Sequence, residues 1–441
     1  MPRAVLAVIV FSAAIACTDA RTFNGEQWAL LDSYRLPSAP PPDPSNSIAD
    51  DPRAALLGRR LFFDTRFSGP LGPPNDAVSN GSLGITGTAG KISCASCHEP
   101  PLGGTDHRSR PAATSFAAGY TGRNAPAVIN AAYAGITEGG WQSWDGRKDS
   151  LWSHSLDPLE SPIAQNSTRL AIAHVLFDNY KANYEALFGA LPDLSNTTRF
   201  PPAGKPGNPA YNNMTQADRA AIDRVFANFG KAIEAYERRL VSTSFAPSAF
   251  DQMLAGDETA MTPAAIRGAR LFVGKAACNE CHRGSAFSDG KFHNIGCPQE
   301  GEHVYPSDVG RHDGIADVKV DVFNRAGAFS DQPDDSHLRG LTASAADIGA
   351  FKTPTLRNVA KTAPYMHDGV YGTLWDVVNH YNSGGATGAY AGTREVTIAP
   401  LLLDASEVDD LVEFLRALSD GDPLPAADFP EGLTSPPEFA N

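Results

Sequence analysis

The sequence predicts a mainly helical, loop-rich fold built from two similar units. Alternating strand patterns are few, whereas helical patterns of apolar residues appear at 52–63, 168–189, 215–240, 263–274 and 405–418. Forty Gly and 34 Pro indicate long connections with many turns between these helices. The segment GRRLF at 58–62 returns in similar form as GARLF at 268–272. A repeat of this kind is typical of a duplicated module.

Different sequence features support these predicted helices. The patterns at 52–63 and 263–274 contain the two copies of the repeat. The pattern at 215–240 is the longest, and we expect it to form the scaffold between two halves. At 405–418 the residues Ala-Ser-Glu begin a helix, and its apolar positions follow near helical spacing at Val408, Leu411, Val412, Phe414, Leu415 and Leu418.

Length and charge limit the possible functions. The chain has 441 residues, enough for two to three domains. It has 36 Lys and Arg against 50 Asp and Glu, a net charge of −14, which argues against a protein that binds nucleic acids or anionic membranes by neutralising phosphates. No apolar run reaches the roughly 20 residues that a membrane-spanning helix needs.

The N-terminus carries an export signal. Residues 1–20 combine one Arg, a short apolar stretch and small residues, which predicts a signal peptide and a periplasmic protein. Cleavage after Ala16 and lipidation of Cys17, which would anchor the chain, are both compatible with these residues. Residues 21–50 follow as an expected extended arm, stiffened by the prolines of 37–47.

Two Cys-x-x-Cys-His motifs carry the clearest chemistry. They consist of Cys94, Cys97 and His98, and of Cys278, Cys281 and His282. The pattern is that of c-type haem attachment, in which two thiols add to the haem vinyl groups and the imidazole binds iron. A redox pair, a zinc half-site and local disulfides are the alternatives, but a motif behind each copy of the repeated helix favours haem. We therefore expect two cytochrome c-like domains, 51–245 and 246–441, each with one covalently attached haem.

Four further motifs are family-specific. FKTPTLRNV at 351–359, TAPYMHDG at 362–369, GRNAP at 122–126 and WDGR at 144–147 resemble the bacterial dihaem cytochrome c peroxidases, and the resemblance spans residues 52–418. It implies one haem per domain and a calcium ion between the domains. Trp144 would conduct electrons between the haems. Asn124 and the backbone carbonyls of Thr362 and Pro364 would bind the calcium ion.

The sixth ligand of the second haem departs from the ordinary peroxidases. They have a Met fourteen residues after the His of the His-Asp-Gly motif, whereas counting from His367 here reaches Tyr381, and no Met follows residue 367. A tyrosine there resembles the MauG subgroup, whose second haem has His and Tyr ligands; His380 is the competing ligand. The segment 117–120 lacks the His that blocks the first haem in ordinary enzymes, which resembles the constitutively open ones.

The distal pocket of the first haem also departs from the family pattern. The family has Gln, Pro and Glu at fixed spacing after the bridging Trp, and the corresponding residues here are His154, Pro158 and Ala164. Cleavage of the peroxide O–O bond needs a group that moves a proton. His154 is the first choice for this acid-base role and Glu160 the second.

Three functions compete. The first is a peroxide-dependent oxidoreductase that stores two oxidising equivalents over both haems and oxidises a residue, expected to be Trp, on a partner protein; the segment 145–152 favours a MauG-like enzyme of the methanobactin-operon (MbnH-like) branch. The second is a cytochrome c peroxidase that reduces hydrogen peroxide with electrons from a small cytochrome or cupredoxin. The third is an electron-transfer protein, which would need both irons six-coordinate.

Overall fold

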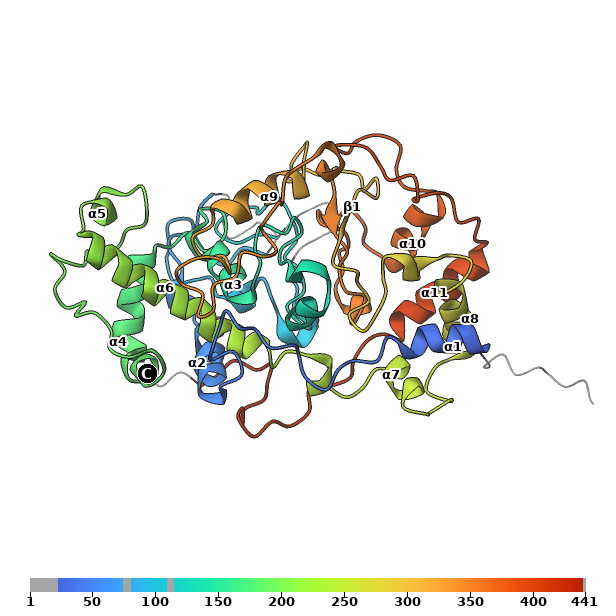
Figure 1. The fold of residues 1–441 in the computed structure, drawn as a ribbon, viewed down its shortest axis with the longest axis horizontal. Coiled ribbons are helices and arrows are strands. Elements are labelled where there is room, and N and C mark those ends of the chain that lie inside the picture. Colours follow the sequence, from blue (N-terminus) through green and yellow to red (C-terminus); the bar gives the residue numbers. More distant parts are fainter. Residues whose placement is uncertain (1–22, 74–80, 109–114, 439–441) are drawn as a thin grey trace, which may run out of the picture.

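The structure is a computed structural model that describes residues 23–73, 81–108 and 115–438. The signal peptide expected at 1–20, and with it Cys17, lies outside the described residues. The molecule is elongated, with α4, α5 and α6 toward one end and α8, α10 and α11 at the other, where α1 also lies (Figure 1). Within the described residues, the one sheet is a two-stranded antiparallel ladder of β1 (Phe292–His293) and β2 (Phe351–Lys352).

Helices joined by long irregular segments make up the rest of the described chain, which confirms the mainly helical, loop-rich prediction. The α-helices are α1 (Gly25–Asp32), α2 (Pro52–Phe63), α3 (Leu151–Glu160), α4 (Arg169–Phe188), α5 (Pro209–Asn212), α6 (Gln216–Glu237), α7 (Ala249–Leu254), α8 (Pro263–Phe272), α9 (Arg311–Val320), α10 (Leu374–Asn382) and α11 (Ala405–Arg416).

The five predicted helices are confirmed as α2, α4, α6, α8 and α11. Each begins where a side-chain oxygen accepts a hydrogen bond from a free N–H group of the first turn. The capping residues are Asp51, Thr168, Thr215, Thr262 and Asp404. The ends of these helices lie within three residues of the predicted limits.

In the first half, α2 crosses α6 at a glycine. A Cβ atom on Gly58 would lie 1.8 Å from the carbonyl oxygen of Ala232, so only glycine allows the two backbones to come this close. One helical turn further along each helix, the rings of Phe62 and Tyr236 meet edge to face at 5.2 Å between centroids.

The second half repeats this crossing with α8 and α11. A Cβ atom on Gly268 would lie 1.9 Å from the carbonyl oxygen of Asp410. One turn further on, Phe272 and Phe414 pack with their centroids 5.1 Å apart. The two crossings use equivalent residues of the repeat, which supports duplication of one module.

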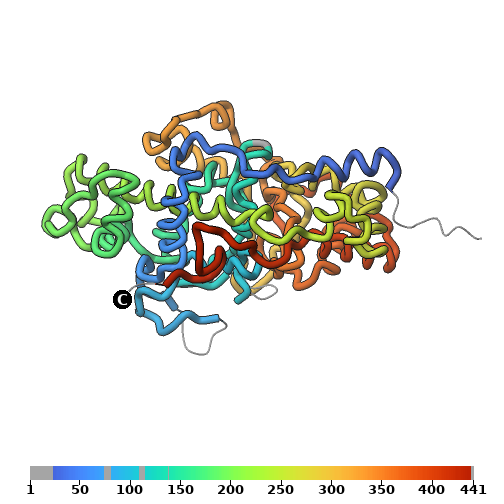
Figure 2. Tube along the Cα trace, turned by 90° about the horizontal axis from the view of Figure 1, so that it is seen from below, coloured from blue at the N-terminus to red at the C-terminus, as the bar shows by residue number. Residues whose placement is uncertain are grey.

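Two hydrophobic cores follow from these crossings, one around α2, α3, α4 and α6 and one around α7, α8, α10 and α11. Segments remote in sequence complete both of them. Leu31 and Tyr34 of the arm lie in the second core, whereas Phe429 and Leu433 near the C-terminus lie in the first. Figure 2 shows the arm (blue) running along the molecule and the C-terminal segment (dark red) lying back over the first half.

The arm at 21–50 is not extended throughout, which corrects the prediction. Residues 25–32 form α1 because the side chains of Asn24 and Gln27 cap each other's backbone N–H groups at its first turn. The later part of the arm is irregular and is fixed by polar contacts. The buried Asn46 donates to the carbonyl of Lys231 at 3.1 Å and to the carboxylate of Glu234 at 3.0 Å, both on α6.

Candidate haem sites and the cavity between them

The first attachment motif forms a tight turn. Cys94–Ser96 is a short 3-10 helix, and the backbone N–H of His98 donates to the carbonyl of Cys94 at 2.9 Å. The Nδ1 atom of His98 lies 3.2 Å from the carbonyl oxygen of Gly104. With Nδ1 donating to this carbonyl, Nε2 is left as the nitrogen that binds iron.

The second motif repeats the arrangement. The backbone N–H of His282 donates to the carbonyl of Cys278 at 2.9 Å, and its Nδ1 atom lies 2.9 Å from the carbonyl oxygen of Phe287. Burial lowers the pKa of both imidazoles, His98 and His282, which favours the neutral form that binds metals. All four motif cysteines are free thiols, so the residues present fit two covalently attached haems.

The arm contributes to the proximal side of the second site. The phenol of Tyr34 donates to the carbonyl of His282 at 2.9 Å. Its ring packs on Phe287 with 4.3 Å between centroids, and its own carbonyl accepts from the buried Arg357 at 2.8 Å. The sequence alone did not indicate this contact, because residues 34 and 282 are 248 positions apart.

A continuous cavity of about 600 Å³ connects the two halves. Its volume is within the range of about 300–1,000 Å³ that is usual for ligand and cofactor sites. Predicted site residues from both halves line it: Asn124, Trp144, His154, Cys278, Cys281, His282, Thr362, Pro364 and Tyr381. The structure thus brings most of the predicted site together. The first attachment motif, with Cys94, Cys97 and His98, is not in the lining, and neither are Pro158 and Glu160.

Tyr381 and its neighbour His380 have different surroundings on α10. Tyr381 lines the cavity that also contains His282. His380 is buried away from it, with Nδ1 3.0 Å from the phenol oxygen of Tyr371 and Nε2 3.1 Å from the carbonyl of Ile295. Both of its ring nitrogens are therefore engaged by the protein, which favours Tyr381 as the ligand in the cavity.

His154 lies on α3, close enough to His98 for the two imidazoles to interact electrostatically. Burial lowers the pKa of His154 to about 3, so its ring is neutral. Pro158, one turn later, has no N–H group and therefore leaves the carbonyl of residue 154 without its usual helical partner.

Glu160 is placed elsewhere. Its carboxylate accepts from the backbone N–H of Arg169 at 2.8 Å and pairs with the Arg169 guanidinium at 2.6 Å. This ion pair at the beginning of α4 keeps the carboxylate out of the cavity. The structure therefore does not bring Glu160 to the position that acid-base chemistry on peroxide would need.

Another carboxyl group takes part in the cavity instead. Glu237, at the end of α6, lines the cavity together with His154 and is 4% exposed. Its Oε2 atom has no hydrogen-bond partner among the described residues. Burial raises the pKa of Glu237 to about 8, so this acid holds a proton at neutral pH. The sequence analysis missed it, because nothing near residue 237 marks it as part of a site.

Trp144 lies in the lining and is held on two sides. Its indole N–H donates to the carbonyl of Asn124 at 2.9 Å, and its own carbonyl accepts from the backbone N–H of Lys352 at 2.8 Å. Beside it, the buried Asp145 pairs with Arg123, which also binds Asp308 at 2.6 Å. These contacts join the two halves around the indole and fix its orientation.

The residues proposed for calcium also meet at the cavity. The Nδ2 atom of Asn124 donates to the carbonyl of Pro364 at 3.0 Å, while its Oδ1 atom is buried with no partner among the described residues. Thr362 lines the same region. A carbonyl-type oxygen without a donor suits a hard cation, so this set fits Ca²⁺.

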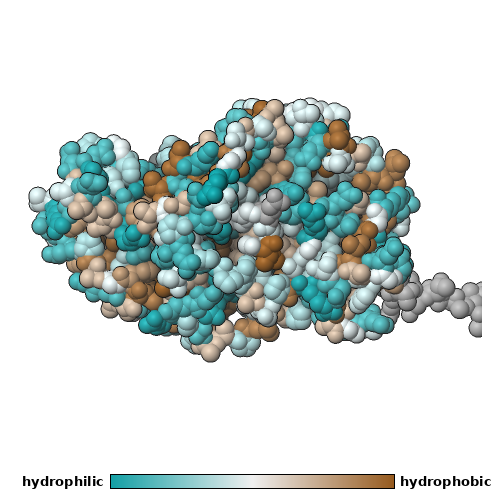
Figure 3. Space-filling view, in the orientation of Figure 1, coloured by the Kyte–Doolittle hydropathy of each residue, from teal (hydrophilic) through white to brown (hydrophobic). Residues whose placement is uncertain are grey.

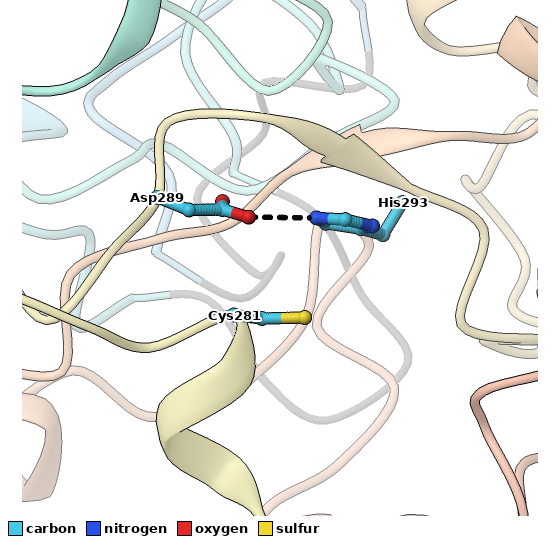
Figure 4. Close-up of side chains that lie close together, drawn as sticks. All are labelled: Cys281, Asp289 and His293. Atoms are coloured by element: carbon cyan, nitrogen blue, oxygen red, sulfur yellow. Dashed lines mark hydrogen bonds and ion pairs between the residues drawn. The ribbon is translucent and has the colours of Figure 1, made fainter.

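Cys281 has a polar neighbourhood, shown in Figure 4. His293 lies 3.0 Å from a carboxylate oxygen of Asp289 and 2.9 Å from one of Glu395. The contact with Asp289, followed by that with Cys281, raises the pKa of His293 and makes it a cation. Since Cys281 is part of the second Cys-x-x-Cys-His motif, this group belongs to the second candidate haem site.

The loop at the first haem lacks a histidine of its own, as the sequence indicates. Ala117 and Ala118 are buried and pack near Cys97. An imidazole from the second half nevertheless approaches this loop, because His303 stacks on Tyr120 with 3.4 Å between ring centroids. His303 is outside the cavity lining.

The comparisons with known proteins agree with this geometry. A model of the di-haem cytochrome c peroxidase family matches residues 52–259, and relatives at 30% identity or more cover most of the chain. The chain therefore belongs to the dihaem cytochrome c peroxidase/MauG family and is a peroxidase-type oxidoreductase with two c-type haems.

Three relatives illustrate the range of the family. The "Cytochrome-c peroxidase IdrP1" of Denitromonas iodatirespirans is 30% identical over 94% of this chain and 93% of its own length. The "Cytochrome-c peroxidase IdrP2" of Pseudomonas sp. (strain SCT) is 31% identical over 85% and 83%. The "Methylamine utilization protein MauG" of Methylorubrum extorquens is 29% identical over 88% and 84%.

Solved structures show the same fold. A "MauG-like protein associated with microbial copper homeostasis" is 26% identical, with a TM-score of 0.56 over 92% of this chain and 98% of its own. The diheme peroxidase BthA of Burkholderia thailandensis is 22% identical, with a TM-score of 0.59 over 86% and 89%, and supports the fold alone.

The face shown in Figure 3 carries small hydrophobic areas scattered among hydrophilic residues. None of the helices in the described part of the chain has both the length and the apolar character needed to cross a bilayer.

Proposed function

We propose that this chain uses hydrogen peroxide to store two oxidising equivalents over both haems and then oxidises a residue, expected to be Trp, on a partner protein. The position of Tyr381 carries this proposal. An anionic phenolate oxygen from Tyr381 would stabilise higher oxidation states of the second iron, and no Met follows residue 367 to replace it. The likeness to a MauG-like protein of copper homeostasis supports the same branch.

The haems supply redox-active iron that reacts with peroxide, and the chain's side chains handle protons. His98 and His282 would each hold one of the two haem irons. The neutral His154 accepts a proton from peroxide at a ring nitrogen. Glu237, protonated at neutral pH and in the same cavity, is the acid that returns a proton. Pro158 frees the backbone carbonyl of residue 154 as a further acceptor.

Trp144 is the proposed conductor between the haems. Its indole lies in the cavity between the two halves, and its contacts with the Asn124 carbonyl and the Lys352 N–H limit its motion. A fixed aromatic ring reduces reorganisation during electron transfer. A calcium ion at Asn124, Thr362 and Pro364 would hold the two halves together next to this ring.

The alternative is a cytochrome c peroxidase that receives electrons from a small cytochrome or cupredoxin. The names of the relatives from Denitromonas and Pseudomonas favour it. The two functions differ in the product. For the first function, mass spectrometry of a candidate partner after peroxide treatment should show added oxygen on Trp. For the second function, an activity assay should show that reduced cytochrome drives the consumption of peroxide. Both functions place the protein in the periplasm, where the signal at 1–20 directs it.

Spectroscopy tests the Tyr381 ligand directly. The ferric protein should give one high-spin and one low-spin EPR signal, and low-spin signals alone would contradict an open first haem. The variant Tyr381→Phe should retain two haems per chain but lose the low-spin signal and the stored oxidising equivalents. The matched variants His380→Gln and Tyr371→Phe should retain both. If His380→Gln removes the low-spin signal and Tyr381→Phe does not, the ligand is His380.

A further inference from the structure

A second group of potential ligands lies beside the cavity and is separate from the haem-attaching residues. Cys297, His367 and Asp368 each offer one ligand atom, and these atoms all lie within 4.8 Å of one another. The three residues are 5%, 3% and 0% exposed. They come from two loops, one after β1 and one before α10, so the group joins segments 70 residues apart.

Two polar atoms of this group have no protein partner. The Nε2 atom of His367 and the Oδ2 atom of Asp368 are buried without a hydrogen bond among the described residues. Cys297 is a free thiol. Buried polar atoms are almost always paired, and an unpaired one costs about 1–3 kcal/mol. Two such atoms lie close to a thiol whose own contacts, with the Pro298 carbonyl and with Oδ1 of Asp368, are both long at 3.8 Å. This arrangement indicates a missing common partner.

The spacing suits a tetrahedral metal ion. The Sγ atom of Cys297 lies 3.8 Å from Oδ1 of Asp368. Bonds of about 2.3 Å to sulfur and about 2.0 Å to oxygen place two tetrahedral ligands roughly 3.5 Å apart. The imidazole of His367 stacks on Phe351 with 3.7 Å between ring centroids, and this contact holds it near the other two ligands.

The charges also balance. A thiolate and a carboxylate together offset the two positive charges of the ion, so the filled site adds no net charge to the interior. The neighbouring charged side chains are already paired with each other, because Arg123 donates to Asp308 through Nε and Nη2 and to Asp145 through Nη1. A thiol and an imidazole favour zinc-like cations over calcium, which prefers oxygen ligands.

We propose that Cys297, His367 and Asp368 form a binding site for a borderline divalent cation such as Zn²⁺. Cys297 and His367 also line the central cavity, so the fourth coordination position faces that cavity. The ion would tie the loop after β1 to the loop that carries the expected calcium ligands. This inference does not depend on whether the partner of the enzyme is a protein residue or an electron donor.

The test uses the haem-loaded protein, because unloaded Cys-x-x-Cys-His motifs bind zinc themselves. After equilibration with Zn²⁺ and removal of the free ion, elemental analysis should find about one zinc per chain. The zinc K-edge absorption spectrum should show one sulfur neighbour at about 2.3 Å and lighter ligands at about 2.0–2.1 Å. Iron in haem does not contribute at this edge.

Variants then assign the ligands. Cys297→Ala and His367→Gln should each lower bound zinc at least tenfold while two haems per chain are retained. His312→Gln, at an exposed histidine that also has a carboxylate neighbour, should not change bound zinc. Zinc below a tenth of an equivalent in the wild type, a spectrum without sulfur, or full zinc in Cys297→Ala would each overturn the proposal. The spectrum decides the question even if a variant fails to fold.

Discussion

The two proximal imidazoles are oriented by backbone carbonyls, Gly104 for His98 and Phe287 for His282. A carbonyl accepts the hydrogen bond from Nδ1–H without removing the proton, so both rings would bind iron as neutral imidazoles. The second ring has an additional support, since Tyr34 contacts both the carbonyl of His282 and the ring of Phe287. Tyr34 is therefore a positioning residue for the second haem.

Replacement of this phenol tests that role. Tyr34→Phe removes the hydrogen bond to the His282 carbonyl and should lower the free energy of unfolding by about 1 kcal/mol. It should also shift the midpoint potential of the second haem and leave that of the first unchanged, as measured by spectroelectrochemical titration. Tyr184→Phe, which removes a buried hydroxyl bonded to Asn228 in the first core, is the control. Equal potentials in Tyr34→Phe and wild type would exclude the positioning role.

The buried carboxyl of Glu237 predicts a dependence of stability on pH. Its pKa is about 8 in the folded protein against an ordinary value of 4.5, so the folded state keeps a proton that the unfolded state loses. Stability from this group is complete below about pH 4.5 and decreases as the pH rises toward 8. Glu237→Gln should therefore be more stable than wild type at pH 8, with a difference that shrinks toward pH 4.5.

Denaturant midpoints measured between pH 4.5 and 8 check this prediction. Glu258→Gln, at an exposed position, serves as the control. A stability difference between Glu237→Gln and wild type that is the same at every pH would show that Glu237 is ionised in the folded protein.

At the scale of single residues, sequence motifs predicted most of the candidate residues that the structure brings together at the cavity, but not Glu237. Attachment motifs are local, so the thiols and His98 and His282 follow from spacing alone. Glu237 and Tyr34 act through contacts with segments that are remote in the chain. No local pattern distinguishes such residues from ordinary core residues.

At the scale of elements, the two longest helices, the two helices of the repeat and α11 were predictable, whereas other short helices were not. The sequence analysis missed α3 and α10, which carry His154 and Tyr381. Pro158 interrupts the pattern of α3. The nine-residue α10 has a capping box, in which Thr373 and Asp376 bond to each other's backbone N–H groups. That signal, Thr-x-x-Asp before an apolar residue, was available in the sequence.

The two helix crossings give a prediction at this scale. Gly58→Ala and Gly268→Ala would each place a methyl group within 2 Å of a backbone oxygen, so the helices must move apart. Each should lower the free energy of unfolding by at least ~3 kcal/mol, the upper range for overpacking. Denaturant unfolding of the haem-loaded protein measures this loss. Gly25→Ala is the control, since its methyl group would meet no atom within 4 Å. If Gly58→Ala and Gly268→Ala lower the free energy of unfolding no more than this control does, the close crossings are contradicted.

At the scale of the whole molecule, the two modules are not independent. The predicted boundary between 245 and 246 follows the repeat, but α1 and Tyr34 pack on the second core and the segment around Phe429 packs on the first. Sequence could not indicate these exchanges, because an apolar residue in a terminal segment does not reveal which core it enters. The domain limits 51–245 and 246–441 remain a proposal about where the repeat divides.

The C-terminal segment should stabilise the first module rather than the second. Phe429 is 2% exposed, packs on Tyr236 and lies under the guanidinium of Arg59. Phe429→Ala should cost about 3–5 kcal/mol. Hydrogen exchange should become faster in α2 and α6 and stay unchanged in α8 and α11. Leu424→Ala, at a residue 46% exposed, is the control. Faster exchange in α8 and α11 would contradict this assignment.

The same exchange of segments determines the order in which the protein matures during synthesis. The chain is made from its N-terminus, so Tyr34 is available before any residue of the second module that it supports. Phe429 and Leu433 are made after every other buried residue of the first core that they complete. The first core can therefore close only after the residues of the second core have been made, although most of its own residues come earlier in the chain.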